Sequence, residues 1–232
     1  MTGPKRYTWL LFDADDTLFD YPRAEAQALQ TTLEQSGVRF QPEYLSLYQG
    51  YNRQVWGEFE RGEIDPLELR TKRFRLLFAA TGLACDPDSF SPRYLQNLAG
   101  CSQLFAGVTE LIRTLSVHYH LAVVTNGLKD VQRPRLAGSA IAPFIEKVFI
   151  LEEIGAAKPD PAFFEAVFRE IGEPNKSEVL IIGDSLTSDM RGGIGYGIDT
   201  CWFNPARKAT ELPITFQVHS LSRLPVLLAA GR

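Results

Sequence analysis

The stretch YTWLLFDADDT, residues 7–17, decides the fold, because it begins as an apolar run and stops at a group of acidic residues. Three later runs are built in the same way: LAVV before Thr125, KVFIL before Glu152 and VLII before Gly183. These runs are rich in Val, Ile and Leu without strict alternation with polar residues, which is typical of strands buried on both faces. Together they predict a parallel β-sheet.

Helices are expected between the later runs. From Phe164 to Ile171 the apolar residues recur at i, i+3, i+4 and i+7, with Asp160 as the N-cap and Pro161 as the first helical residue. Strands that alternate with helices along the chain indicate an α/β fold with a doubly wound, Rossmann-like parallel sheet.

The spacing of the runs indicates an insertion. More than a hundred residues separate the first run from LAVV, whereas a βαβ unit needs about 30. Within this gap, residues 44–59 and 67–78 each show one apolar stripe with helical period. We therefore expect an all-helical subdomain of four helices over residues 21–104, inserted into a core made of residues 1–20 and 105–232.

Composition excludes several classes of protein. Of the 232 residues, 45% are hydrophobic and 22% charged, which predicts a globular protein with a sizeable core. The net charge of −4 argues against binding of a nucleic acid polymer. No apolar run approaches the roughly 18 residues of a membrane helix, so a cytoplasmic location without membrane contact is expected. Cys85, Cys101 and Cys201 lack metal-ligand spacing and are interpreted as buried, reduced thiols. The sequence leaves the oligomeric state open.

Aspartates follow two of the predicted strands, at the place where open α/β sheets bind ligands. Asp13 and Asp15 share one side for as long as the chain stays extended. Asp184 follows another strand, and Asp189 lies five residues further on. Four carboxylates that converge on one crevice would repel each other unless a cation held them. Oxygen ligands without nearby His or Cys favour a hard ion such as Mg²⁺.

A phosphate group is the expected partner of this cation, since Mg²⁺ commonly bridges protein carboxylates and a substrate phosphate. Lys158, which follows the KVFIL run, offers a positive charge to such a phosphate. Thr125, Asn126 and the backbone of Gly127 offer hydrogen bonds to its oxygens. The sequence thus predicts a phosphate site beside the metal.

The same acidic residues suit the hydrolysis of a phosphate monoester. These esters hydrolyse very slowly without a catalyst, and one established route passes through an aspartyl-phosphate. In that scheme Asp13 attacks phosphorus, while Asp15 gives a proton to the leaving alkoxide and later removes one from water.

Four short motifs together resemble the motifs of the haloacid dehalogenase-like superfamily, in order and in spacing: DADDT at 13–17, TNG at 125–127, AKPD at 157–160 and GDSLTSD at 183–189. The resemblance implies that Thr125 and Lys158 bind phosphate. The insertion between the first two motifs is similar to the type-1 helical cap of this superfamily, which closes over the substrate.

The resemblance also assigns roles to the four aspartates. It implies that Asp13 is the nucleophile and a Mg²⁺ ligand. Asp15 would be the acid/base residue and a metal ligand through its backbone. Asp184 would be a further Mg²⁺ ligand, and Asp189 would support the metal site.

Further stretches are similar to the pyrimidine 5'-nucleotidase group of house-cleaning phosphatases: FDADDTLFD, W-x(5)-G-x-I from Trp56, RF at Arg73 and GGIGYGIDTCWFNP from Gly192. This likeness implies nucleoside 5'-monophosphates as substrates. Trp56 and Arg73 are candidates for stacking on a base and holding a polar group of the substrate, or else for ordinary core packing. Dehalogenases of the superfamily lack the second aspartate that Asp15 supplies, and phosphonate hydrolases rely on a cap lysine, for which only Lys72 is available.

The sequence therefore predicts a Mg²⁺-dependent phosphomonoester hydrolase that acts on a small phosphorylated metabolite, with a nucleotide favoured. Phosphatases of the same architecture for phosphoglycolate or a sugar phosphate are alternatives, because the sequence does not determine which cap residues contact the substrate. A phosphomutase is another alternative and would yield isomerised product with little free phosphate. A catalytically silent binding module is a remote one. The GGIGYG segment does not fit the dinucleotide-binding pattern, and no P-loop or nucleophile-elbow string occurs.

Overall fold

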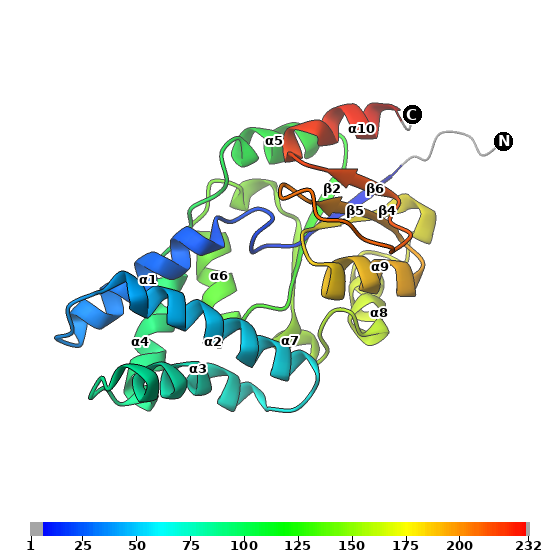
Figure 1. Ribbon diagram of the computed structural model, residues 1–232. Helices are drawn as coiled ribbons and strands as arrows, with labels where there is room; N and C mark the ends of the chain where they lie inside the picture. Colours follow the sequence, from blue (N-terminus) through cyan, green and yellow to red (C-terminus); the bar gives the residue numbers. More distant parts are fainter. Residues whose placement is uncertain (1–6, 231–232) are drawn as a thin grey trace. The chain divides into compact units, whose positions relative to one another are not determined.

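The chain forms two compact units, with divisions after Tyr21 and after Cys101. Figure 1 shows the ribbon of the computed structural model, which describes residues 7–230. The first unit joins the two segments outside the insertion and holds all strands of the described residues. The second unit is the inserted segment, in which the described elements are helices.

The first unit is built on a six-stranded sheet of order β3-β2-β1-β4-β5-β6, in which all neighbouring strands are parallel. The strands are β1 (Trp9–Phe12), β2 (His120–Thr125), β3 (Lys147–Ile150), β4 (Val179–Gly183), β5 (Asp199–Phe203) and β6 (Phe216–Val218). The first four coincide with the four predicted runs, which confirms the parallel α/β fold. β5 and β6 lie outside the predicted strands, because β5 follows the glycine-rich segment closely and β6 has only three residues.

β1 lies between β2 and β4, and its Phe12 is paired with Val123 on one side and Ile182 on the other. Its side chains alternate between two apolar clusters: Leu10 joins the cluster on one face of the sheet and Leu11 the cluster on the other. Both faces of the central strand are therefore buried, as the absence of polar alternation in its sequence predicts.

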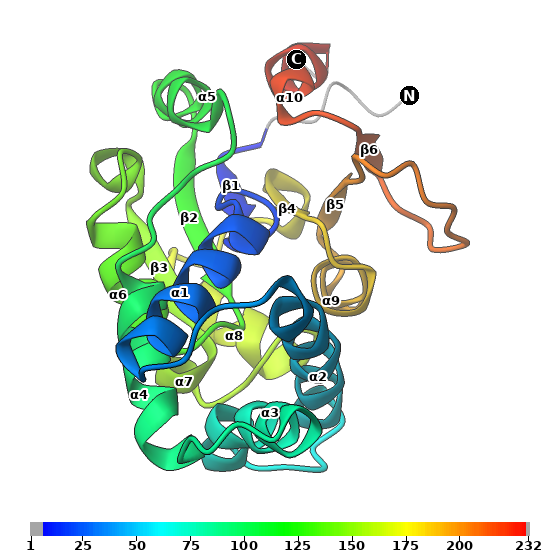
Figure 2. The same cartoon turned by 60° about the vertical axis from the view of Figure 1, so that its left-hand side comes forward.

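Helices cover both faces of this sheet, as Figure 2 shows. One face carries α5 (Val108–Leu115), α6 (Lys129–Ala137) and α10 (Leu224–Ala230). The other carries α7 (Leu151–Ile154), α8 (Pro161–Glu170) and α9 (Arg191–Tyr196). Short helical turns complete the unit: η1 (Ala142–Phe144), η2 (Lys176–Glu178), η3 (Leu186–Met190) and η4 (Leu221–Arg223). The predicted start of α8 is confirmed, because Asp160 accepts a hydrogen bond from Ala162 N at 2.9 Å.

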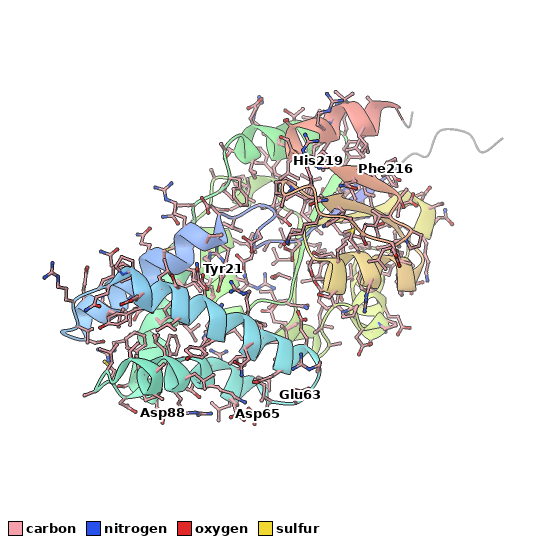
Figure 3. The ribbon with its side chains drawn as sticks, in the orientation of Figure 1. Tyr21, Glu63, Asp65, Asp88, Phe216 and His219 are labelled. Carbon is pink, nitrogen blue, oxygen red and sulfur yellow. The ribbon has the colours of Figure 1, made fainter. Side chains whose placement is uncertain are left out.

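The second unit contains four helices, as predicted: α1 (Tyr21–Gln35), α2 (Pro42–Glu60), α3 (Pro66–Thr81) and α4 (Pro87–Ala99). α3 packs against both α2 and α4. Aromatic rings fill the space between these three helices: Tyr48, Phe74, Phe78, Phe90 and Tyr94. Asp65, labelled in Figure 3, begins α3 by accepting a hydrogen bond from Glu68 N at 2.7 Å. Caps and aromatic packing thus define this unit.

Two glycines of the segment after β4 lie in close contact with neighbouring elements. A Cβ atom at Gly192 would lie 2.7 Å from Phe164 Cε2, and one at Gly193 would lie 2.6 Å from Thr200 Cγ2. These glycines let α9 approach α8 and β5 closely.

The structure also bears on the cysteines and on the search for a membrane-spanning helix. All three cysteines are free, and Cys101 and Cys201 are buried as predicted. The prediction of burial is wrong for Cys85, which is partly exposed because it lies in the loop between α3 and α4. Within residues 7–230, no helix is long and apolar enough to cross a membrane.

Candidate active site

The candidate site lies at the edge of the sheet where β1, β2 and β4 end. Asp13 directly follows β1, Thr125 is the last residue of β2, and Asp184 directly follows β4. Because β1 is parallel to both neighbouring strands, these residues leave the sheet at the same edge. Lys158 reaches them from the loop between α7 and α8.

The ammonium group of Lys158 is the centre of the hydrogen-bond network at this edge. Its Nζ donates to Asp13 Oδ1, Asp189 Oδ1 and the carbonyl oxygen of Val124, each at 2.7 Å. Burial lowers the pKa of Lys158, but the charges of Asp13 and Asp189 raise it by more, so this pKa lies above its ordinary value. The lysine is therefore protonated and joins two carboxylates.

Three carboxylates lie close together beside this lysine. Asp13, Asp184 and Asp189 each have an oxygen within 4.8 Å of the others. Burial raises the pKa of Asp13 well above its ordinary value; Lys158 opposes this rise, while the two neighbouring carboxylates add to it. Burial, followed by the charges of Asp189 and Asp16, raises the pKa of Asp184 to about 7. When all three carboxylates are ionised, the single lysine leaves two negative charges uncompensated.

The charge and the donor atoms of this cluster fit a divalent cation. Carboxylate oxygens are the ligands that Mg²⁺ prefers, and the group found among the described residues contains neither His nor Cys. A bound cation would relieve the repulsion that contributes to the raised pKa values of Asp13 and Asp184. The cluster is therefore a candidate magnesium site.

The π-helical turn η3 brings Asp189 into the cluster. This side chain is fully buried, and its Oδ2 accepts a hydrogen bond from Ser185 N at 3.2 Å. A Cβ atom at Gly183 would lie only 2.2 Å from the same oxygen. The glycine that ends β4 therefore leaves the space from which Asp189 reaches Lys158.

Asp15 does not belong to the group of three carboxylates found among the described residues. The chain leaves the extended conformation after Asp13: Leu18 N bonds to Ala14 O, and Asp16 has a φ of 60°. The argument from period two therefore does not reach Asp15, and three of the four carboxylates form the cluster.

Two side chains from outside the predicted site hold Asp15. Gln132 Nε2 donates to Asp15 Oδ2 at 2.6 Å, and Arg135 Nη1 donates to Asp15 Oδ1 at 2.5 Å. Both donor residues are buried, at 1% and 0% exposure, whereas 26% of the Asp15 side chain is exposed. The sequence does carry a signal for them, because Gln132 and Arg135 lie one turn apart on α6, on the side that also buries Leu136. Polar residues on a buried helix face need polar partners.

The loop after β2 supplies polar groups in two ways. Thr125 Oγ1 accepts a hydrogen bond from Gly127 N at 3.0 Å and keeps its own hydroxyl hydrogen to donate. The side chain of Asn126 donates to the carbonyl oxygen of Lys158 and accepts from its backbone N–H, both at 2.8 Å. The Asn126 amide thus orients the lysine, so the donor this residue can offer a phosphate is its backbone N–H.

The two candidate substrate contacts in the helical unit differ in placement. Arg73 is 1% exposed; its Nη1 donates to Asn52 Oδ1 at 2.8 Å, and its Cζ lies 5.2 Å from the ring centre of Phe74. This placement favours the packing alternative for Arg73. Trp56 is half-buried and meets Phe59 edge to face, with ring centres 5.9 Å apart, and its contact with a substrate stays a prediction.

The chain is similar to known proteins in both sequence and structure. A family model described as haloacid dehalogenase-like hydrolase matches residues 10–203. The HAD-hydrolase YfnB of Bacillus subtilis (strain 168) is 36% identical over 222 residues, which is 95% of this chain and 94% of YfnB. A crystal structure of YfnB bound to magnesium matches with a TM-score of 0.91, covering 97% of this chain and 99% of that one.

Two further relatives carry the name pyrimidine 5'-nucleotidase. PynA of Streptococcus pneumoniae (strain ATCC BAA-255 / R6) is 37% identical over 221 residues, or 94% of this chain and 93% of PynA. YjjG of Escherichia coli (strain K12) is 30% identical over 225 residues, or 96% of this chain and 98% of YjjG. The similarity therefore extends over both compact units.

Proposed function

The chain belongs to the haloacid dehalogenase-like hydrolase family, and from this premise we propose that it is a Mg²⁺-dependent phosphatase of small phosphate monoesters. The observation that carries the proposal is the position of Lys158, whose Nζ lies 2.7 Å from Asp13 Oδ1 beside three clustered carboxylates. One edge of the sheet thus combines a nucleophile, a positive charge for a phosphate and oxygen ligands for a divalent cation.

In the proposed reaction Asp13 attacks phosphorus, and the bond from phosphorus to the ester oxygen breaks. Lys158 supplies positive charge to the phosphate oxygens, and the Thr125 hydroxyl donates a hydrogen bond to them. Asp15 gives a proton to the leaving alkoxide and then takes one from the water that hydrolyses the aspartyl-phosphate. The products are the free alcohol and inorganic phosphate, and Asp13 is regenerated as a carboxylate.

The acidic cluster suits the metal in this proposal. Asp13 and Asp184 would hold Mg²⁺ through carboxylate oxygens, and Asp15 through its backbone carbonyl. Asp189 would support them by fixing Lys158, which it contacts at 2.7 Å. The ion supplies positive charge that lets a phosphate dianion approach a cluster of carboxylates.

Nucleoside 5'-monophosphates are the proposed substrates. Two relatives named pyrimidine 5'-nucleotidase match nearly the whole chain, at 37% and 30% identity, and support this choice. Within the helical unit, Trp56 offers a partly exposed aromatic ring on which a base could stack. Arg73 is left out of the proposal because its guanidinium lies in the interior of that unit.

The phosphatase proposal is tested with p-nitrophenyl phosphate, by measuring turnover with Mg²⁺, with EDTA and in Asp13→Asn. Turnover should need Mg²⁺ and be lost in the variant, because an amide is a poor nucleophile towards phosphorus. Circular dichroism and a thermal melt of Asp13→Asn serve as the control for folding. Wild-type turnover in Asp13→Asn would exclude the covalent mechanism.

The nucleotide proposal is tested separately, by measuring phosphate release from pyrimidine and purine 5'-monophosphates, phosphoglycolate and several sugar phosphates. A pyrimidine nucleotide should give the highest kcat/KM. Comparable values for nucleotides and unrelated sugar phosphates would defeat this choice of substrate and leave the phosphatase proposal standing. Isomerised product with little free phosphate would instead indicate a phosphomutase.

A further inference from the structure

The carboxylate of Asp15 is gripped at both oxygens from one helix. Gln132 Nε2 binds Oδ2 at 2.6 Å and Arg135 Nη1 binds Oδ1 at 2.5 Å. Because each oxygen receives its own donor, the carboxylate can neither rotate about its bond to Cβ nor swing sideways without breaking a hydrogen bond. Two lone-pair directions are then filled, and a carboxylate has about four, so it keeps the capacity to exchange a proton on its exposed side.

Neighbouring residues leave space for both donors and pack against them. Gln132 and Arg135 lie three positions apart on α6, so they face the same way. The guanidinium of Arg135 lies over the ring of Phe19, with Cζ 4.6 Å from the ring centre. A Cβ atom at Gly127 would lie 2.3 Å from Gln132 Nε2, so glycine in the loop after β2 leaves the space that the amide needs.

The amide of Gln132 makes its hydrogen bond to Asp15 and leaves its own oxygen without a partner among the described residues. Its Oε1 is buried and has no hydrogen-bond partner among the described residues, while its Nε2 is spent on Asp15. An unsatisfied buried oxygen destabilises a fold, and an apolar side chain of the same size would avoid that cost. The glutamine therefore fits a functional contact better than a packing role.

We propose that Gln132 and Arg135 are positioning residues that aim the carboxyl group of Asp15 at the leaving oxygen of the substrate. This inference rests on the proposed phosphatase function and adds two residues to its machinery. Their contribution should depend on the leaving group, since a basic alkoxide needs a proton as it departs and a nitrophenolate does not.

A series of esters with increasingly basic leaving groups tests the proposal: p-nitrophenyl phosphate, phenyl phosphate and benzyl phosphate. The value of kcat/KM reports the first phosphoryl transfer, in which the leaving group departs. In Gln132→Met and Arg135→Lys we expect kcat/KM for benzyl phosphate to fall about 10- to 100-fold, and that for p-nitrophenyl phosphate to fall at least several-fold less. In Asp15→Asn, kcat/KM should also fall more for benzyl phosphate than for p-nitrophenyl phosphate, and this difference should be the largest of the three variants.

Arg133→Met is the matched control on the same helix. Arg133 is exposed, and its hydrogen bonds go to Glu153 and the carbonyl oxygen of Val148 rather than to Asp15. Its substitution should change kcat/KM equally, and little, across the three esters. Gln132→Met should also keep or raise the melting temperature, because it removes the unsatisfied Oε1.

Equal losses on all three esters in Gln132→Met and Arg135→Lys would show a merely structural role and overturn the inference, as would unchanged kcat/KM for benzyl phosphate. A wild-type protein that hydrolyses none of the esters would instead defeat the proposed function, and the inference with it. Should Arg135→Lys fail to fold, Gln132→Met alone decides, because a lost amide leaves no buried charge unpaired.

Discussion

Each of the two units buries an arginine against aromatic rings, and the two arginines differ in what they hold. Arg135 in the sheet unit lies 4.6 Å from the ring centre of Phe19 and donates to Asp15. Arg73 in the helical unit lies 5.2 Å from the ring centre of Phe74 and donates to Asn52. The burial and the stacking are alike, but the partner of each arginine points to a different role.

The difference lies in where each network ends. Asp15 keeps 26% of its side chain exposed, so the charge of Arg135 acts on a group that is open to solvent. Asn52 passes the network on to Glu25, which is 4% exposed and also binds Gln49. A buried arginine is therefore a functional candidate only when its partner is open to a ligand, and burial alone does not distinguish the two cases.

The largest effect is expected from a pair of lysines, one in each unit. Lys158→Met removes the charge that contacts Asp13 and Asp189, and kcat/KM should fall about 10²- to 10³-fold. Lys72→Met removes a partly exposed partner of Glu58 at 3.0 Å, and kcat/KM should stay close to wild type. Steady-state kinetics with p-nitrophenyl phosphate measure both. A large loss of kcat/KM in Lys72→Met would show that the helical unit supplies a catalytic charge, which would contradict the contrast drawn between the two units.

The next largest effect concerns stability. Arg73→Met should lower the free energy of unfolding by about 3 kcal/mol, because it leaves a buried polar network without its cation. The kcat/KM of the folded protein should remain unchanged. Urea denaturation followed by circular dichroism gives the first quantity, and kinetics well below the transition give the second. If kcat/KM fell while the free energy of unfolding stayed at the wild-type value, Arg73 would again be a candidate for contact with the substrate.

The metal site should respond to pH through Asp184. Its pKa is raised from 3.8 to about 7 in the fold, so the unfolded chain binds fewer protons in this interval. The metal-free protein should therefore lose stability as pH rises from about 4 to 7. Mg²⁺ competes with that proton, so the rise in melting temperature that Mg²⁺ causes should grow from pH 6 to pH 8.

The expected rise at pH 8 is about 5–10 °C when the free metal is about 100 times its Kd. Differential scanning fluorimetry with and without Mg²⁺ measures it. Asp184→Asn should abolish the rise, whereas Glu25→Gln in the helical unit should keep it. A rise that is independent of pH, or that survives in Asp184→Asn, would contradict the assignment of Asp184 as a ligand.

The smallest effect is expected from two helical glycines. Gly193→Ala in α9 places a Cβ 2.6 Å from Thr200 and 2.7 Å from Ile181, and should destabilise the protein by about 1–3 kcal/mol. Gly50→Ala in α2 meets no heavy atom within 4 Å and should stabilise it by about 0.5–1 kcal/mol. Chemical denaturation of both variants measures the signs. A destabilised Gly50→Ala protein would show closer packing on that face of α2 than the structure has.

Much of the site could be located from the sequence because its signals are local. An apolar run that stops at Asp13, at Thr125 or just before Asp184 marks a buried strand and its end, and parallel strands end at a common edge. Apolar periodicity in the same way identifies two of the four helices of the insertion, over residues 44–59 and 67–78. The strand β6 escapes such reasoning because three residues are too few to show a period.

The sequence by itself therefore determined the parallel sheet, the helical insertion and the strand ends that carry acidic residues. Only the tertiary structure decided how the side chains meet. Lys158 binds Asp13 across 145 positions of the chain, and Arg135 binds Asp15 across 120. Such contacts depend on strand register and on the turn that the backbone makes after Asp13, which redirects Asp15 towards α6. Periodicity describes one element at a time, so it cannot show which buried charge on one element meets which carboxylate on another.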